Sequence, residues 1–167
     1  VTIGSSDIAW QDDLMTITAF EVDHRPVAPA AGYRVDYRGR SVVISGDSVA
    51  ADSLFEAAQG ADLLLHDALS RTLLDPMIGA ARNSGASNLA QIMTDVIDYH
   101  ADSLSLEARA EAAGIRQLAF YHLVPVPPNA LAEKMFARGL SADTILVKDL
   151  HTFDLPTGST EILISAP

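Results

Sequence analysis

From residue 41 onward, short apolar runs of strand length alternate with longer segments whose apolar residues recur at helical spacing. This alternation is typical of α/β layered folds, in which helices cover a sheet that contains parallel strands. We therefore expect an α/β fold. The expected strands are residues 41–45, 62–65, 116–121 and 144–147, and the expected helices are residues 50–60, 103–113 and 129–138.

The N-terminal part reads as strands without helices. Residues 15–21 are rich in β-branched and aromatic types and predict a strand. Residues 25–32 are rich in Pro and Ala and predict a loop. Residues 33–37 then predict the first strand of a hairpin whose turn lies at residues 38–40.

Residues 69–98 carry the weakest pattern in the chain. Within them, residues 89–97 have helical spacing and residues 83–85 predict a loop. The tail after residue 148 predicts a closing hairpin.

The composition limits the size of the fold and the class of partner. With 167 residues, of which 49% are hydrophobic, the chain can form one domain with its own core, and we expect a single domain over residues 1–167. Twenty-two acidic residues against eleven basic residues give a formal net charge of −11. Because such a surface repels phosphate backbones, nucleic acid is not expected as a partner.

The chain has no cysteine, so a metal site here has to use imidazole and carboxylate ligands. No apolar run approaches the roughly 20 residues that a membrane helix needs. The N-terminal residues 1–20 do not resemble a targeting segment. We expect a soluble chain without a membrane partner, and its compartment stays open.

Side chains that can bind metals recur beside the predicted elements. His24, Asp47, His66 and His122 each follow a predicted strand, and His100 precedes a predicted helix. Loops at strand ends build functional sites because the sheet holds them at fixed positions. Taken singly, each histidine is more simply explained as a surface or structural residue. Together, imidazole and carboxylate groups in this arrangement favour a zinc site, in which an Asp can bridge two ions.

Three strings of the sequence resemble segments of the ribonuclease Z-like branch of the metallo-β-lactamase-fold hydrolases. The string FEVDHRPVAPAAGYRVDYRGRSVVISGDS resembles the segment in which a ligand His precedes GYR, a hairpin and SGD. ADLLLHDA resembles the family's aDlLiHEa, with Asp67 in place of the usual Glu. DYHADSLSLEARAEAAGIRQLAFYHLVP resembles the segment with a His before a helix and a last ligand His after a strand.

The resemblance implies the C-terminal half of a metallo-β-lactamase-like αββα sandwich that binds two zinc ions. It implies that His24 and His122 are terminal ligands, one to each zinc, and that Asp47 bridges the two ions. It also implies catalytic roles for three further residues. His100 stabilises charge or protonates the leaving oxygen, and His66 and Asp67 orient that His or the ligands.

The activity that the resemblance implies is hydrolysis of an ester-type bond by a zinc-bound hydroxide, with a phosphodiester, sulfate ester or lactone as substrate. The family's HxHxDH segment has no match in this sequence, so we expect the site to be incomplete in this chain. Each zinc would keep two protein ligands where a catalytic zinc needs three. A catalytically inactive fragment or interaction domain of the same fold is the alternative. An unrelated α/β domain with structural histidines is a third interpretation.

The partners follow from the same features. The net acidity favours a small-molecule ester over tRNA as the substrate. Half of a sandwich would also leave an apolar sheet face uncovered. We therefore expect a homo-oligomer, or packing against a missing N-terminal half.

Overall fold

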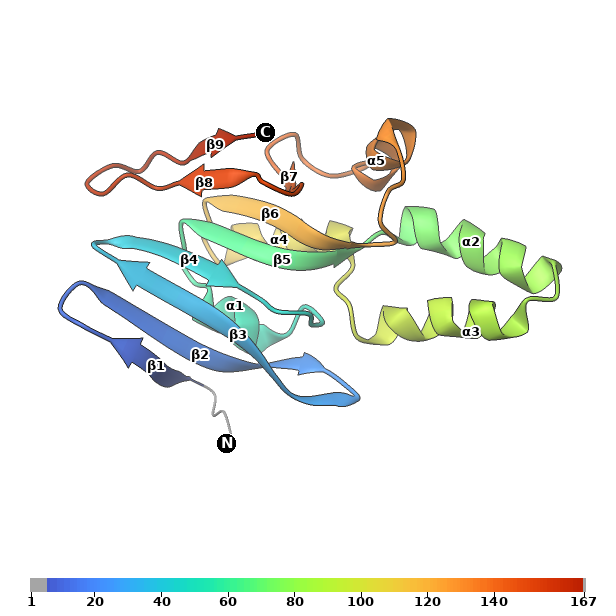
Figure 1. Ribbon diagram of the computed structural model, residues 1–167, viewed down its shortest axis with the longest axis horizontal. Coiled ribbons are helices and arrows are strands. Elements are labelled where there is room, and N and C mark those ends of the chain that lie inside the picture. The colour runs from blue at the N-terminus through green and yellow to red at the C-terminus, as the bar shows by residue number, and fades with distance from the viewer. Residues whose placement is uncertain (1–5, 167) are drawn as a thin grey trace.

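The computed structural model describes residues 6–166, which form a seven-stranded mixed sheet and a separate small hairpin (Figure 1). Residues 1–5 and 167 lie outside the described residues. They are part of the predicted single domain over residues 1–167, and residues 1–5 also belong to the N-terminal stretch that was compared with targeting segments. The strands of the large sheet lie side by side in chain order. They are β1 (Asp7–Gln11), β2 (Met15–His24), β3 (Val27–Tyr37), β4 (Arg40–Ile44), β5 (Leu63–Leu69), β6 (Gln117–Val124) and β7 (Ile145–Leu146).

The sheet changes character at β4. The pairs from β1 to β4 are antiparallel, and the pairs from β4 to β7 are parallel, with helices in the connections. The predicted alternation of strands and helices after residue 41 is therefore confirmed. The helices are α1 (Asp52–Ala57), α2 (Arg71–Asn83), α3 (Ser87–Asp95), the 3-10 helix η1 (Val96–Asp98), α4 (Ser103–Ala112) and α5 (Ala130–Phe136). The tail forms the predicted hairpin, β8 (Thr152–Asp154) and β9 (Leu163–Ser165).

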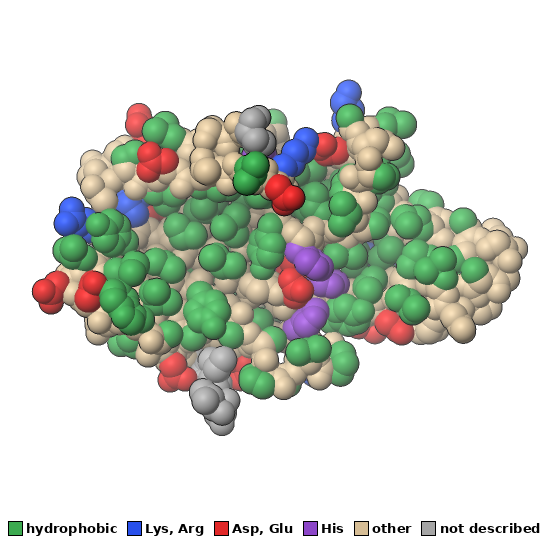
Figure 2. Space-filling model, viewed as in Figure 1, with side chains coloured by type: hydrophobic (Ala, Val, Ile, Leu, Met, Phe, Trp, Pro, Cys, Tyr) green, Lys and Arg blue, Asp and Glu red, His purple; other side chains and the backbone are tan. Residues whose placement is uncertain are grey.

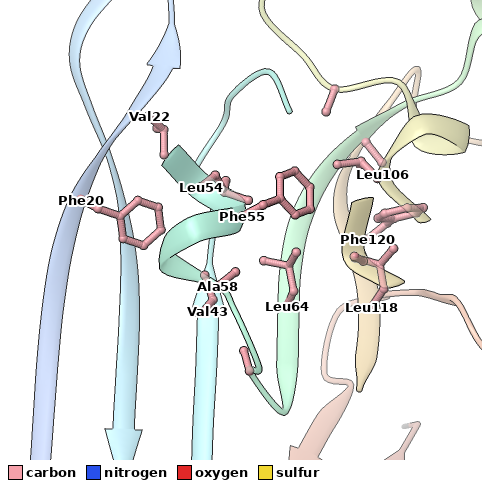
Figure 3. Close-up of a cluster of buried hydrophobic side chains, with 14 of the residues drawn as sticks. Phe20, Val22, Val43, Leu54, Phe55, Ala58, Leu64, Leu106, Leu118 and Phe120 are labelled. Atoms are coloured by element: carbon pink, nitrogen blue, oxygen red, sulfur yellow. The ribbon is translucent and has the colours of Figure 1, made fainter. Parts of the chain in front are cut away.

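One face of the sheet packs against helices α1 and α4. Because side chains alternate along a strand, every second residue of each strand points to this face. Figure 3 shows how strand and helix side chains meet in one buried cluster. The cluster includes Phe20, Val43, Leu64, Leu118 and Phe120 from the strands, and Leu54, Phe55 and Leu106 from the helices.

The other face of the sheet is apolar and only partly covered. Trp10, Tyr33, Tyr37 and Ile44 are between 38% and 44% exposed. Figure 2 shows hydrophobic side chains gathered over the strands on this side of the molecule. Apolar patches of this kind are found where a surface binds protein, membrane or ligand.

The prediction of a loop over residues 25–32 is wrong, because β3 begins at Val27. This part of β3 pairs with β2, for example Ala31 with Glu21. β4 pairs with β3 only from Tyr33 onward. Pro29, which has no N–H to donate, therefore lies where one edge of β3 is free, and the strand tolerates it.

Strands β5 and β6 are longer than predicted. β5 continues to Leu69, so His66 and Asp67 lie within the strand and not after it. β6 continues to Val124, so His122 also lies within a strand. Pairing between the two strands extends through their polar ends, and apolar periodicity alone did not reveal it.

Helix α2 lies in the segment with the weakest sequence pattern, and it contains Pro76. Its buried residues Leu74, Ile78 and Ala81 recur at helical spacing and hold it to the rest of the fold. The predicted helix over residues 89–97 corresponds to α3 and η1. Over the described residues, no helix combines the length and the apolar character needed to cross a membrane.

We predict that Phe120→Ala lowers the free energy of unfolding by about 3–5 kcal/mol, because it leaves a cavity under α1 and α4. Phe120 is fully buried, whereas Leu163 is 53% exposed. Leu163→Ala is the control and should change stability by about 0.5 kcal/mol or less. Urea unfolding measures both. Equal effects of the two substitutions would contradict the packing described above.

Candidate metal centre

Three imidazole rings lie in a row at one end of the sheet. His24 ends β2, His100 lies just before α4, and His122 lies in β6. The ring centroids of His24 and His100 are 5.4 Å apart, and those of His100 and His122 are 5.2 Å apart. Figure 2 shows the histidines together at the surface, beside an acidic side chain. Segments far apart in the sequence thus bring their metal-binding groups to one place.

Asp47 joins this row beside His122. Its Oδ2 lies 3.7 Å from Nε2 of His122. The loop that carries Asp47 turns at Gly46, which has a φ of +69°. A Cβ atom there would lie 2.6 Å from the carbonyl oxygen of Ala31, so glycine is needed for this close approach.

His122 leaves the regular strand geometry. Its φ is +43°, and the pairing of β6 with β5 shifts between Tyr121 and Leu123. Such a bulge turns a side chain out of the alternation of the strand. The bulge explains how a residue inside β6 points to the row of imidazoles.

The surroundings of His24 fix its tautomer. Its Nδ1 lies 3.0 Å from the carbonyl oxygen of Tyr99. A carbonyl oxygen only accepts, so Nδ1–H donates and a neutral ring keeps the lone pair on Nε2. Metal-binding histidines are typically held by such a bond on the second nitrogen. His24 is therefore oriented as a metal ligand requires.

A buried carboxylate supports the centre of the row. Nδ1 of His100 donates to Oδ2 of Asp67 at 2.7 Å, and the Ser48 N–H donates to Oδ1 at 3.1 Å. His66 Nδ1 lies 3.0 Å from the same Oδ1 and 2.7 Å from the Asp67 carbonyl oxygen. Burial raises the pKa of Asp67, but the hydrogen bonds from His100 and His66 outweigh it and hold the pKa below its ordinary value.

His66 itself does not reach the row through any described contact. Its ring is fully buried and stacks with Phe55 at a centroid distance of 6.5 Å. Nε2 of His66 is buried without a hydrogen-bond partner in the described residues. The contact of His66 with Asp67 supports the predicted role of His66 in orienting His100 or the metal ligands. This role stays a prediction.

Sequence reasoning missed two tyrosines beside the site. Tyr99 contacts His24 edge-on at 5.2 Å and lies 5.1 Å from the His100 ring. Burial raises the pKa of Tyr121 despite its hydrogen bond to Ser45, and the negative charge of Asp47 adds to the increase. Each tyrosine directly precedes a predicted site histidine, and this adjacency was the available signal.

The donor groups fit zinc in type but not in number. Two imidazoles and a carboxylate are groups that zinc binds, and the orientation of His24 matches that use. Within residues 6–166, however, no three His, Asp or Glu side chains lie close enough to enclose an ion. Metal binding by His24, Asp47 and His122 therefore stays a prediction.

Comparison with known proteins finds relatives over most of the chain. A ribonuclease Z from Mycobacterium avium is 34% identical over 145 residues, covering 85% of this chain and 48% of that protein. A ribonuclease Z from Mycobacterium tuberculosis is 36% identical over 117 residues, covering 70% of this chain and 39% of that protein. The chain thus spans half or less of the length of these relatives.

A solved structure shares the fold. The metallo-beta-lactamase fold protein YhfI from Bacillus subtilis superposes with a TM-score of 0.57 at 21% sequence identity. The match covers 83% of this chain and 49% of that chain. The search against protein-family models found no match.

We predict that Asp67→Asn lowers the free energy of unfolding at neutral pH by roughly 1.5–3 kcal/mol, because the buried imidazoles lose a charged acceptor. The pKa of Asp67 is lowered in the folded state, so this stabilisation is present above the ordinary Asp pKa of about 3.9 and is lost as the pH falls through the folded value. The difference between wild type and variant should therefore shrink below about pH 4.

Urea unfolding over a pH series measures this difference. Asp143→Asn, at an exposed position, is the control and should show no such dependence. The difference in the free energy of unfolding could instead stay constant down to the lowest pH at which the protein is folded. The charge of Asp67 would then contribute nothing to stability.

Proposed function

Since the chain is a ribonuclease Z-like protein of the metallo-β-lactamase fold, we propose that it supplies part of the active site of a metal-dependent hydrolase. The bond cleaved is of the ester type, in a phosphodiester, a sulfate ester or a lactone. The observation that carries the proposal is the row of His24, His100 and His122 with Asp47 at its end.

His24, Asp47 and His122 are the residues that would hold zinc. If bound there, zinc would supply Lewis-acid chemistry for the cleavage of an ester-type bond. The carbonyl oxygen of Tyr99 keeps the Nε2 lone pair of His24 available. Asp47, from the loop after β4, and His122, from β6, bring their donor atoms to within 3.7 Å of each other.

His100 would act as the general acid that donates a proton to the leaving group. Asp67 accepts from its Nδ1, so a protonated His100 presents Nε2–H as the transferable proton. The carboxylate stays charged in this position because His66 and the Ser48 N–H also donate to it. Its hydrogen bond fixes the direction of the His100 ring.

A second candidate is a catalytically inactive domain of the same fold. The observation that favours it is that no three metal-binding side chains converge within residues 6–166. On this reading the histidine row is structural, and the chain acts as a fragment or an interaction domain. The two candidates differ in whether the zinc-treated chain hydrolyses an ester-type substrate.

We predict that the chain binds zinc and that Asp47→Ala weakens binding by at least about tenfold, because one negatively charged ligand is lost. Competition with a zinc-sensitive dye measures the affinity, and elemental analysis after dialysis measures the metal retained. Asp36→Ala is the matched control, because Asp36 is a partly exposed carboxylate paired with Arg34. It should leave zinc binding unchanged.

Equal zinc affinity in wild type and Asp47→Ala would refute the assigned ligands. Hydrolysis of bis(4-nitrophenyl) phosphate by the zinc-loaded chain then separates the two candidates. Turnover that is lost in His100→Ala supports the hydrolase. Zinc binding without turnover supports the inactive domain.

We also propose that a second copy of the chain covers the open sheet face. The support is the apolar character of Trp10, Tyr33, Tyr37 and Ile44, which are large side chains on one surface. A symmetric dimer places the same patch on both sides of its interface. In a longer protein, the alternative occupant is a further layer of the same polypeptide.

We predict a dimer, of twice 17.7 kDa, by light scattering at micromolar concentration. Tyr33→Lys should shift the protein toward the monomer, because it places a charge in an apolar interface. Leu89→Lys, at an exposed position on α3, is the control and should leave the mass unchanged. A monomeric wild type would rule out self-association through this face.

A further inference from the structure

The turn that leads from β4 to Asp47 is bonded to β5 through one serine. Ser45 follows β4 directly and is fully buried. Its Oγ accepts from the Asp67 N–H at 3.4 Å and donates to the carbonyl oxygen of Gly46 at 2.5 Å. These bonds hold the start of the turn to β5, whereas His122 lies one strand further along, in β6.

Tyr121 reaches the same turn from β6. It lies opposite Asp67 in the pairing of β6 with β5. Its hydroxyl forms hydrogen bonds with the Ser45 side chain and with the backbone of Gly46. Burial raises the pKa of Tyr121, and the negative charges of Asp47 and Asp67 add to the increase. The phenol therefore lies near both carboxylates and stays protonated at neutral pH.

Each hydrogen in this contact has one acceptor. The Ser45 hydroxyl gives its single hydrogen to the carbonyl oxygen of Gly46. The Tyr121 hydroxyl therefore donates to the Ser45 oxygen, and it accepts from the Gly46 N–H. Removing the hydroxyl of Tyr121 would take this acceptor away from the Gly46 N–H.

The contact spans the gap between two proposed metal ligands. Gly46 directly precedes Asp47, and Tyr121 directly precedes His122. The φ of His122 is +43°, at the bulge of β6. Residues other than glycine rarely adopt a positive φ, so the surroundings have to hold this conformation. The donor atoms of Asp47 and His122 lie 3.7 Å apart, and a bond one residue away from each ligand is well placed to set this distance.

We propose that Tyr121 is a positioning residue, whose hydroxyl ties the Gly46 turn to the bulge of β6 and thereby sets the separation of Asp47 and His122. The inference rests on the proposed function, because this separation matters to the chemistry only if the two side chains hold metal. It assigns the role to the hydroxyl and not to the ring. The ring would pack between its neighbours equally well as phenylalanine.

The first test is hydrogen exchange in the metal-free chain, followed by NMR. Tyr121→Phe keeps the ring and removes the hydroxyl. We expect the Gly46 amide to exchange at least about tenfold faster in this variant, because it has lost its acceptor. The amide of Ala119, a fully buried residue of β6, should exchange as it does in the wild type.

Thr94→Val is the matched control. Thr94 lies in α3, and its Oγ1 donates to the carbonyl oxygen of Ala90 at 2.8 Å. The substitution thus also removes a hydroxyl that bonds to the backbone, and it keeps the shape of the side chain. The exchange rate of the Gly46 amide should be unchanged in this control.

The second test is zinc affinity, measured by competition with a zinc-sensitive dye. We expect Tyr121→Phe to weaken binding by about tenfold, because partners behind a metal ligand typically contribute at least this much. The urea midpoint of the metal-free chain should change no more than in Thr94→Val. In the Asp47→Ala background, Tyr121→Phe should cause no further loss of affinity, because the hydroxyl acts through Asp47. A merely structural role would instead lower the urea midpoint.

An unchanged exchange rate of the Gly46 amide in Tyr121→Phe would overturn the proposal. A zinc affinity that Asp47→Ala lowers and Tyr121→Phe does not would also overturn it. A chain that binds no zinc refutes the proposed hydrolase, and the exchange rates of the metal-free chain still decide whether Tyr121 holds the turn. The two proposals can therefore fail separately.

Discussion

The buried Asp67 carboxylate is the group on which the arrangement of the candidate centre depends, because it joins three separate segments. Asp67 comes from β5, Ser48 from the loop after β4, and His100 from the loop before α4. Removing a donor would leave an uncompensated charge in the interior, which is costly. The hydrogen bonds to Asp67 therefore hold both the loop that carries Asp47 and the ring of His100 in place. The same bonds lower the pKa of Asp67 and keep it charged at neutral pH.

The order of the parallel strands determines which groups meet. β5 lies between β4 and β6, and parallel strands end at the same edge of a sheet. Asp67 is therefore placed between Asp47, which follows β4, and His122, which lies in β6. One face of the sheet is occupied by α1 and α4, so the site is built at the strand ends. The opposite face keeps its apolar side chains partly exposed, as half of an αββα sandwich requires.

Much of the fold was predictable, because strand and helix periodicity reports directly which faces are buried. The α/β class, the helices near residues 103–113 and 129–138, and the family resemblance are all confirmed. Periodicity did not reveal the polar ends of β5 and β6, where pairing between neighbours extends the strands past the apolar runs. It also gave no sign of the bulge that turns out His122. The Tyr99 contacts depend on residues 75 positions apart, which local patterns do not encode.

The segment with the weakest sequence pattern reaches the histidine row. Residues 69–98 form α2, α3 and η1, and their end supplies Asp95 and Asp98 to a cleft beside His24. The proposed chemistry instead uses side chains held by the sheet. A rigid sheet can therefore keep the same reacting groups while a connecting segment changes which molecule reaches them. Likeness at the strand ends thus supports the class of reaction rather than one particular substrate.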